Sequence, residues 1–327
     1  MRRFTWGKNV RNYPSVSIVI PAYDAQYTIA RCLRSIKSLD YPQDKLEVVI
    51  VDNGSTDDTA QIVKDLGFTV ESLPEGNVGA VRNYGAKIAK GEVIAHTDSD
   101  CILPRLWLAN AVYFLYSNSR IGAVGGGCAV LDDATLLEKA WVSVQKEKIR
   151  DVKYLPACNF ILRKSLFDLL GGFNDKITAG EDDDLSVRIS EAGLKMVSIK
   201  DCYVFHLGYP KTYYEIFKRQ VWHGKSALDL SGTTATMLWA TLIFCGGLLS
   251  CLLLAYFQVH SLPYWAGAIG LVFLMPFLMT LKKMRNSPIS VQQFLLLVTI
   301  FISFFTGRLF GLIIALKIRW FQKIVKQ

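Results

Sequence analysis

Two aspartates separated by one residue, Asp98 and Asp100, stand directly after an apolar run in this chain. The run, Glu92–His96, is typical of a buried strand, so both carboxylates fall at its carboxyl end. Ligands of α/β folds bind at this edge of the sheet. Carboxylate oxygens suit Mg²⁺ or Mn²⁺, and such a cation suits a diphosphate. An aspartate-rich turn that only closes a strand would look the same, so the neighbouring residues decide between the two interpretations.

Polar side chains also follow the two preceding expected strands, Val16–Ile20 and Leu46–Val51. They belong to the segments Pro21-Ala22-Tyr23-Asp24 and Asp52-Asn53-Gly54-Ser55. We expect both groups to face the same crevice as Asp98, where an acidic side chain can hydrogen-bond a base or a ribose. The second group also resembles a capped helix start, and both interpretations can hold together.

Four consecutive carboxylates, Glu181-Asp182-Asp183-Asp184, begin the expected helix Glu181–Ala192. A solvated run at the positive helix end is the simpler interpretation. Helical geometry nevertheless separates their roles: Asp184 can pair with Arg188 one turn later, while Asp182 points about 100° away from Glu181 and is outside that pair. Crowded carboxylates disfavour mutual ionisation, which favours proton uptake by one of them. Asp182 and Glu181 are therefore the candidate catalytic residues, with Asp182 as general base.

One histidine, His206, follows the short expected strand Tyr203–Phe205. A lone histidine is usually structural. Imidazole beside carboxylates is, however, compatible with Mn²⁺, so we predict that His206 joins Asp100 as a metal ligand.

The elements expected to position these residues alternate between strands and helices, which indicates an α/β fold with a parallel, doubly wound sheet. The expected helices of the first half are Ile29–Leu39, Thr56–Leu66 with Ser55 or Thr56 as cap, and Val78–Ala89 with Asn77 as cap. The second half is less regular. Its expected elements are a helix at Pro104–Tyr116, a strand at Ile121–Leu131 with a glycine kink, a helix at Leu136–Ile149, and strands at Cys158–Leu162 and Lys195–Ile199. A short strand at Phe68–Ser72 belongs to the first half.

Several of these motifs occur in an order that resembles the family 2 glycosyltransferases of the GT-A fold, over about residues 14–210. The matching motifs are Pro21-Ala22-Tyr23, Val51-Asp52-Asn53-Gly54-Ser55, Gly79-x-x-Arg82-Asn83-x-Gly85, Asp98-Ser99-Asp100, Gly171-Gly172-Phe173 and Glu181-Asp182-x-Asp184-Leu185-x-x-Arg188. Each motif alone is weak evidence for the family. The resemblance is specific because the motifs stand in the same order as in the family. Asp24 stands where many members have asparagine, and the Gln-x-x-Arg-Trp motif of processive synthases is not present.

The resemblance implies an inverting single displacement on a nucleotide-diphospho-sugar. By it, Asp52 contacts the base, Asp98 and Asp100 hold the ribose and the metal-diphosphate with Mg²⁺ or Mn²⁺, and Asp182 deprotonates the acceptor. His206 matches a histidine that binds metal in some relatives. The remaining residues assigned to the donor site are Pro21, Ala22, Tyr23, Asp24, Asn53, Gly79, Arg82, Asn83 and Ser99.

The carboxylate pair also bears on the acceptor. A phosphate acceptor is already an anion and needs no base, whereas a hydroxyl must lose a proton as it attacks. We therefore expect a hydroxyl on a lipid-linked or other membrane acceptor. The alternatives are transfer to a polyprenyl phosphate, and a degenerate transferase domain that serves a membrane glycan-export complex. A nucleotidyltransferase would also use paired aspartates, but we find no Gly-rich basic phosphate loop near the N-terminus.

The C-terminal third indicates a membrane domain. Hydrophobic residues make up 51% of the 327, and from Leu230 to Leu281 there is no charged residue. The expected spans are 237–259, 262–281 and 294–316, preceded by an amphipathic interface helix within 211–229. The catalytic domain is then residues 1–210 and the membrane domain residues 230–327. The third span contains Arg308, so it either crosses fully, breaks and returns, or lies in the interface.

Charge predicts the orientation. The net charge is +9, and basic residues flank the expected spans, which fits an anionic cytoplasmic leaflet. The N-terminal residues lack the apolar core of a signal peptide, so we expect a cytoplasmic catalytic domain at the plasma (inner) membrane. The expected soluble domain has no basic stripe interleaved with aromatic residues, so we do not expect it to bind nucleic acid. The seven cysteines form no C-x-x-C pair, so neither a zinc site nor a disulfide framework is expected.

Overall fold

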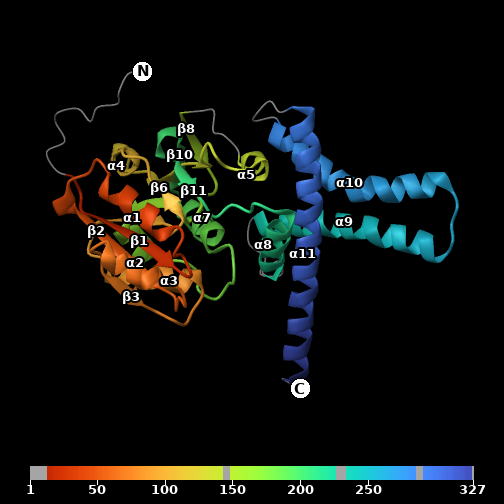
Figure 1. The fold of residues 1–327 in the computed structure, drawn as a ribbon, viewed down its shortest axis with the longest axis horizontal. Coiled ribbons are helices and arrows are strands. Elements are labelled where there is room, and N and C mark those ends of the chain that lie inside the picture. Colours follow the sequence, from red (N-terminus) through yellow and green to blue (C-terminus); the bar gives the residue numbers. More distant parts are fainter. Residues whose placement is uncertain (1–12, 143–147, 226–232, 285–289, 326–327) are drawn as a thin grey trace. The chain divides into compact units, whose positions relative to one another are not determined.

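The computed structural model describes residues 13–142, 148–225, 233–284 and 290–325. The chain divides into two compact units. The first comprises Met1–Leu131, Gln145–Lys176 and Glu181–Gly208, and the second comprises Asp132–Val144, Ile177–Gly180 and Tyr209–Gln327. The first unit holds the strands and the second holds the long helices α9, α10 and α11 (Figure 1).

An eight-stranded sheet forms the centre of the first unit. Its strands are β1 Val16–Ala22, β2 Leu46–Asp52, β3 Val70–Ser72, β4 Val93–Thr97, β6 Ile121–Gly125, β8 Ile149–Val152, β9 Asn159–Arg163 and β10 Lys195–Ile199, in the spatial order β3-β2-β1-β4-β9-β6-β10-β8. The pairs within β3-β2-β1-β4 are parallel, as is β6 with β10. β9 runs antiparallel to both of its neighbours, and β8 runs antiparallel to β10. The predicted α/β fold with a mostly parallel sheet is confirmed.

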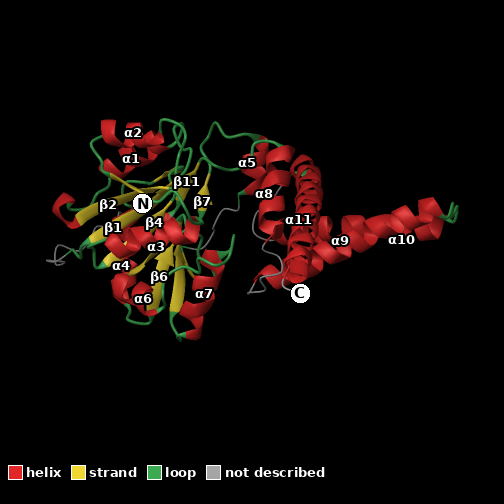
Figure 2. Ribbon diagram, turned by 90° about the horizontal axis from the view of Figure 1, so that it is seen from below, coloured by secondary structure: helices red, strands yellow, loops and turns green. Residues whose placement is uncertain are grey.

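Helices cover both faces of this sheet, because its central strands are apolar on both sides. These helices are α1 Ile29–Lys37, α2 Thr59–Asp65, α3 Val78–Ile88, α4 Trp107–Ser117, α6 Lys164–Leu169 and α7 Glu181–Glu191 (Figure 2). In β1, Ile18 and Ile20 pack into one core with α1 and α4. Val19 points the other way, into a second core with α3, α6 and α7.

A three-stranded sheet lies beside the large one, in the order β5 Cys101–Ile102, β11 Val204–His206, β7 Cys128–Ala129. The predicted strand Ile121–Leu131 is therefore wrong as one element, because it divides between two sheets. The physical reason is Gly126, where a Cβ atom would collide with the backbone of Cys202. The small sheet pairs His206 with Cys101, the residue that follows Asp100.

Two predicted helices also differ from the structure. The second helix begins at Thr59 and not at Thr56, because the Ser55 and Thr56 backbone groups bind carboxylates of the preceding turns. The helix predicted over Leu136–Ile149 is shorter: α5 covers Leu136–Trp141, and Ile149 begins the strand β8. The predicted cap of α3 is confirmed, since the Asn77 side chain accepts the Ala80 N–H at 3.0 Å.

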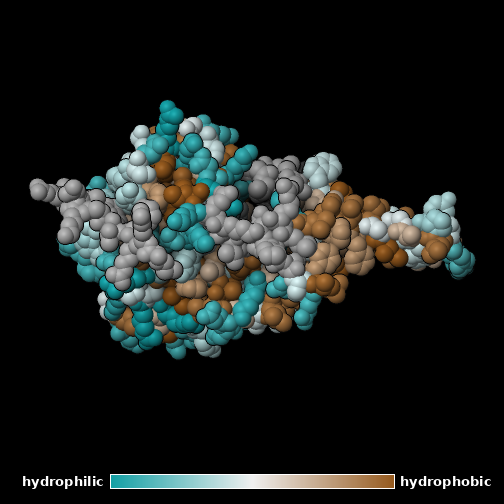
Figure 3. Space-filling model, turned by 90° about the horizontal axis from the view of Figure 1, so that it is seen from above, coloured by the Kyte–Doolittle hydropathy of each residue, from teal (hydrophilic) through white to brown (hydrophobic). Residues whose placement is uncertain are grey.

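The second unit contains α5 and four longer helices, α8 Tyr213–Lys225, α9 Thr233–Tyr256, α10 Leu262–Met284 and α11 Val291–Val325. Among the described residues, three stretches are long and apolar enough to cross a membrane: Met237–Tyr256, Leu262–Lys283 and Val291–Ile318. The α9–α10 hairpin accordingly presents an apolar surface, brown at the right of Figure 3. α11 continues unbroken through Gly307, so the alternative in which the third apolar segment breaks there and returns is wrong.

Candidate functional site

A pocket of about 330 Å³ opens in the first unit where β1, β2 and β4 end. Its wall is formed by Pro21, Ala22, Tyr23, Asn53, Val78, Val81, Arg82, Asp98, Ser99 and Asp100. The structure therefore brings together residues from four separate segments of the chain, most of which the sequence had selected. Tyr23 is 62% exposed, so its aromatic side chain is accessible to a ligand in the pocket.

Two predicted carboxylates lie outside the pocket wall and bind backbone instead. Asp52, at the end of β2, accepts hydrogen bonds from both the N–H and the hydroxyl of Ser55. Asp24 has a φ of 44° and accepts the Thr56 N–H at 2.8 Å. Aspartate and asparagine are the non-glycine residues that best tolerate this left-handed backbone. These two carboxylates fix the turns that carry Tyr23 and Asn53.

Asn83 and Gly79 also lie outside the pocket wall. The Asn83 side chain accepts the Phe173 N–H at 2.8 Å and donates to the Phe173 carbonyl at 2.8 Å. It thereby holds the Gly171–Phe173 turn, where Gly172 has a φ of 73° and a Cβ atom would meet Asn83 Oδ1. Gly79 gives close approach to the backbone at Asn174. Both residues shape the fold around the pocket.

Arg82 connects the pocket to the acidic helix α7. Its Nη2 lies 2.7 Å from Asp98 Oδ1, and its Nη1 lies 2.6 Å from Glu181 Oε1. The Arg82 side chain is only 4% exposed. Burial alone would lower its pKa, but the Asp98 and Glu181 carboxylates raise it, so the guanidinium stays charged. Asp98, Arg82 and Glu181 therefore form one continuous network of charge.

Glu181 and Asp182 have different surroundings. Burial raises the pKa of Glu181 and Asp182 raises it further, while Arg82 opposes both. Asp182 accepts three hydrogen bonds: from the Tyr154 hydroxyl at 2.8 Å, from the Ala157 N–H at 3.0 Å and from the Asp183 N–H at 3.0 Å. These donors fix the orientation of the Asp182 carboxylate. Tyr154 could not be identified from the sequence, because no motif around it indicates a contact with α7.

Asp184 pairs with Arg188, as predicted from their spacing. Arg188 Nε and Nη2 lie 2.8 and 2.6 Å from the same oxygen of Asp184. Arg188 also donates to the Leu170 carbonyl at 2.6 Å, so the pair fixes α7 to the end of α6. Asp184 therefore has a structural place, distinct from that of Asp182.

Asp98, Asp100 and His206 form a group that can hold a metal ion. One ligand atom from each lies within 4.8 Å of the others, and His206 Nε2 is 3.6 Å from Asp100 Oδ1. Two oxygens and an imidazole nitrogen are a donor set that fits Mn²⁺ and, with water ligands, Mg²⁺. Gly208 borders the group, because a Cβ atom there would collide with Asp100 Oδ2.

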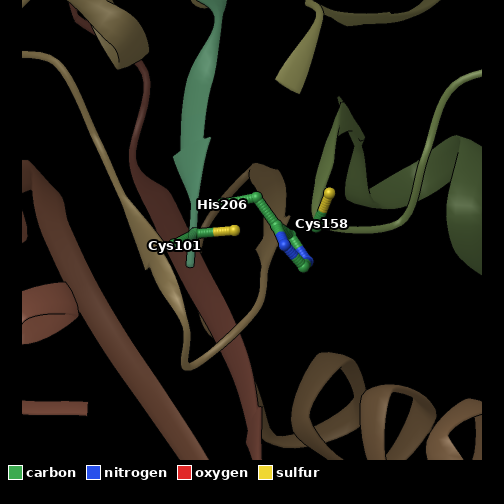
Figure 4. Close-up of side chains that lie close together, drawn as sticks. All are labelled: Cys101, Cys158 and His206. Carbon is green, nitrogen blue, oxygen red and sulfur yellow. The ribbon is translucent and has the colours of Figure 1, made fainter. Parts of the chain in front are cut away.

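Three cysteines gather behind His206, which the sequence did not predict. Ligand atoms of Cys101, Cys158 and His206 lie within 4.8 Å of one another (Figure 4), and Cys128 Sγ is 3.4 Å from Cys158 Sγ. Burial raises the pKa of Cys101 to about 12, which disfavours the thiolate. The structure describes all seven cysteines of the chain, and none of them forms a disulfide. The pairing of β11 with β5 and β7 brings Cys101 and Cys128 to His206, whereas Cys158 directly precedes β9 of the large sheet. The group therefore depends on contacts between distant segments, and no spacing in the sequence reveals it.

Comparison with known proteins gives consistent matches. Residues 17–171 match the model of the family "Glycosyl transferase family 2". The glycosyltransferase AglE of Haloferax volcanii is 28% identical over 229 residues, which cover 66% of this chain and 74% of AglE. The probable glycosyltransferase YdaM of Bacillus subtilis is 27% identical over 208 residues, which cover 58% of this chain and 49% of YdaM. The match thus spans about half the length of YdaM.

A solved structure extends the likeness to the fold. The mannosyltransferase PcManGT from Pyrobaculum calidifontis, in complex with GDP-Man and Mn²⁺, superposes with a TM-score of 0.64 at 21% identity. The likeness covers 94% of this chain and 88% of that one, so the long C-terminal helices are included along with the sheet.

Proposed function

Because this chain is a family 2 glycosyltransferase with a GT-A fold, we propose that it transfers a sugar, with inversion, from a nucleotide-diphospho-sugar to a hydroxyl of a membrane-associated acceptor. The observation that carries the proposal is the grouping of Asp98, Asp100 and His206 beside the pocket. The match to the glycosyltransferase family and the GT-A fold support the sugar transfer itself.

The pocket supplies the donor site in this proposal. Tyr23 and Asn53, which line the pocket, are proposed to bind the nucleoside, and Asp52 follows at the end of β2. Asp98 is proposed to bind the ribose, and Arg82 keeps that carboxylate in position. Asp100 and His206 are proposed to hold Mg²⁺ or Mn²⁺. A cation bound there stabilises negative charge on the leaving diphosphate.

Asp182 is the proposed general base. An attacking hydroxyl must lose a proton, and a carboxylate fixed by hydrogen bonds is suited to receive it. Tyr154 and the Ala157 N–H hold Asp182 in one orientation. Glu181 is proposed to assist through Arg82, since its own carboxylate is engaged there and buried. In the proposed single displacement the deprotonated hydroxyl attacks the anomeric carbon as the bond to the nucleoside diphosphate breaks, and this inverts the configuration of the sugar.

The membrane supplies the acceptor in this proposal. We place the catalytic domain, residues 1–210, on the cytoplasmic side of the plasma membrane, followed by the interface segment 211–229 and the membrane domain 230–327. The three apolar helices support this arrangement, and the acceptor would be a sugar already attached to a lipid, or a lipid alcohol.

The donor site is tested by binding UDP, GDP, dTDP and CDP to the detergent-purified full chain, with and without Mn²⁺. We expect one nucleotide to bind in a metal-dependent manner, and Asp100→Ala to weaken that binding at least about tenfold. Asp168→Ala removes an exposed carboxylate outside the pocket and should change nothing. Equal nucleotide binding by Asp100→Ala, or no binding by any form, would contradict the proposed site.

The base is tested with Asp182→Asn and two acceptors. Transfer to a hydroxyl acceptor should fall at least about 100-fold, because an amide cannot take up the proton. Asp184→Asn is the matched control on the same helix and should retain the chemical step. Normal sugar transfer by Asp182→Asn to a polyprenyl phosphate that the wild type also uses would contradict the proposal that the acceptor is a hydroxyl.

A further inference from the structure

Arg308 is a cation in the apolar helix α11, and two helices fix its position. Its Nε donates to Oε1 of Gln220 on α8 at 3.0 Å, and Gln220 is only 3% exposed. The guanidinium carbon lies 5.2 Å from the centroid of the Phe304 ring. The side chain is therefore built into the contact between α8 and α11, and its terminal nitrogens remain available as donors.

Among the residues that the structure describes, no carboxylate neutralises this arginine. The chain contains neither Asp nor Glu after Asp229. The one acidic residue of α8, Glu215, accepts the Lys211 N–H at 2.7 Å, and Glu138 of α5 closes the capping box with Thr135. Within the described part of the chain, Arg308 makes no ion pair. A half-buried charge without a counter-ion is costly, which favours an anion from another molecule.

Other donors stand nearby on α8. Burial lowers the pKa of His223 to about 3, with Arg308 and Arg219 as further causes. Both guanidinium groups are therefore close enough to His223 to act on its charge, while the imidazole itself is neutral. Arg219 and His223 are four residues apart on α8 and therefore lie on the same side of that helix. They add positive charge and a ring N–H to the α8 surface that packs on α11.

The packing of α8 sets the depth of this site in the membrane. Ser303 of α11 donates to the Tyr213 carbonyl at 2.9 Å, and farther along a Cβ atom on Gly311 would collide with the Val221 carbonyl. α8 thus covers the middle of α11, and it carries Lys218 and Arg219, which hydrocarbon does not accommodate. The covered part of α11 therefore lies at headgroup level.

The arrangement of the long helices agrees with this placement. α11 runs across the α9–α10 hairpin and not alongside it (Figures 1 and 2), with Phe305 stacked on Phe244 of α9 where they meet. If the hairpin crosses the bilayer, a helix that lies across it follows the membrane surface. At that surface the available anions are lipid phosphates.

We propose that Arg308, together with Arg219 and His223, forms a binding site for the phosphate group of a membrane lipid. A guanidinium binds two phosphate oxygens with its parallel N–H groups, which a lysine cannot do. Gln220 positions Arg308 for this contact. The phosphate belongs either to a bulk anionic phospholipid or to a lipid-linked acceptor; the second source rests on the function proposed above.

The test is lipid binding to the full chain in a neutral detergent, with no donor and no metal present. The purified protein is titrated with phosphatidylglycerol, with a polyprenyl phosphate, and with phosphatidylcholine as the zwitterionic reference. We expect Arg308→Gln to weaken binding of at least one anionic lipid about tenfold, and Arg308→Lys to recover only part of it. Lys317→Gln, an exposed cation on the same helix, should bind as the wild type does.

The outcomes separate the two sources. Similar affinity for both anionic lipids identifies a headgroup site, and a clear preference for the polyprenyl phosphate identifies the acceptor. Unchanged binding of both lipids by Arg308→Gln overturns the proposal. Asp100→Ala should leave lipid binding intact, so failure of the donor site and failure of the lipid site are distinguishable. Nucleotide binding by Arg308→Gln confirms that this variant is folded.

Discussion

Replacing Arg82 by methionine removes the charge that joins Asp98 to Glu181. Methionine has a similar length, so the main change is a buried Glu181, with a side chain only 9% exposed, whose carboxylate has lost its partner. Removal of one member of a buried ion pair costs about 3–5 kcal/mol. For a domain of 150–250 residues each kcal/mol shifts the Tm by roughly 2–4 °C. We therefore expect the unfolding temperature to fall by roughly 6–20 °C.

The pH dependence gives this prediction a sign. Burial already raises the pKa of Glu181 in the folded chain, and Arg82 opposes that rise. Without Arg82 the folded-state pKa lies further above the unfolded one. A group with a raised folded pKa contributes stability at low pH and loses it as the pH rises. The defect of Arg82→Met should therefore be smaller at pH 5 than at pH 8.

The assay is thermal unfolding of the full chain in detergent, followed by tryptophan fluorescence at both pH values. The matched control is Lys195→Met, because the Lys195–Asp151 pair has the same 2.7 Å separation but is exposed, and it should shift the Tm little. Adding Glu181→Gln to Arg82→Met should restore part of the loss. A loss no larger than that of Lys195→Met, or one independent of pH, would refute the reasoning.

Three further substitutions test other contacts. Gly208→Ala puts a Cβ atom against Asp100 Oδ2 and should weaken Mn²⁺-dependent nucleotide binding at least about tenfold, measured by calorimetry; undiminished binding would mean that Asp100 is not a ligand. Asn83→Ala removes both hydrogen bonds to Phe173 and should lower stability by about 1–3 kcal/mol, seen as a lower Tm; an unchanged Tm would show that the turn holds itself. Gly311→Leu has no room beside α8 and should lower both the Tm and phosphatidylglycerol binding; retention of both would contradict the close packing of α8 on α11.

The parts of the fold that the sequence predicted well are those decided locally. β1, β2 and β4 are continuous apolar runs, and the Asn77 cap marks the start of α3. Because these strands are parallel, the polar residues at their carboxyl ends meet at one edge of the sheet. This is why most pocket residues could be predicted. The spacing of Asp184 and Arg188 was equally local, since one helical turn separates them.

The missing parts depend on pairing between distant segments. No local pattern shows that β9 runs antiparallel between β4 and β6, or that the chain leaves the large sheet at Gly125. Arg82 was selected for the donor site, yet its bridge to Glu181 requires α3 and α7 to be adjacent. Motifs identify which residues matter, whereas tertiary packing determines the partner that each one finds.

The short helix α5 has a consequence for the order of folding. Its Trp141 packs against Phe301 and Phe304 of α11, and the Trp141 carbonyl accepts a hydrogen bond from Lys283 of α10. During synthesis α5 leaves the ribosome long before α10 and α11 are made, so its apolar side chains are exposed to solvent in the meantime. A chain cut after Gly208 would leave it uncovered permanently. Soluble expression of the chain truncated after Gly208 should therefore improve when Leu137 and Trp141 are replaced by polar residues.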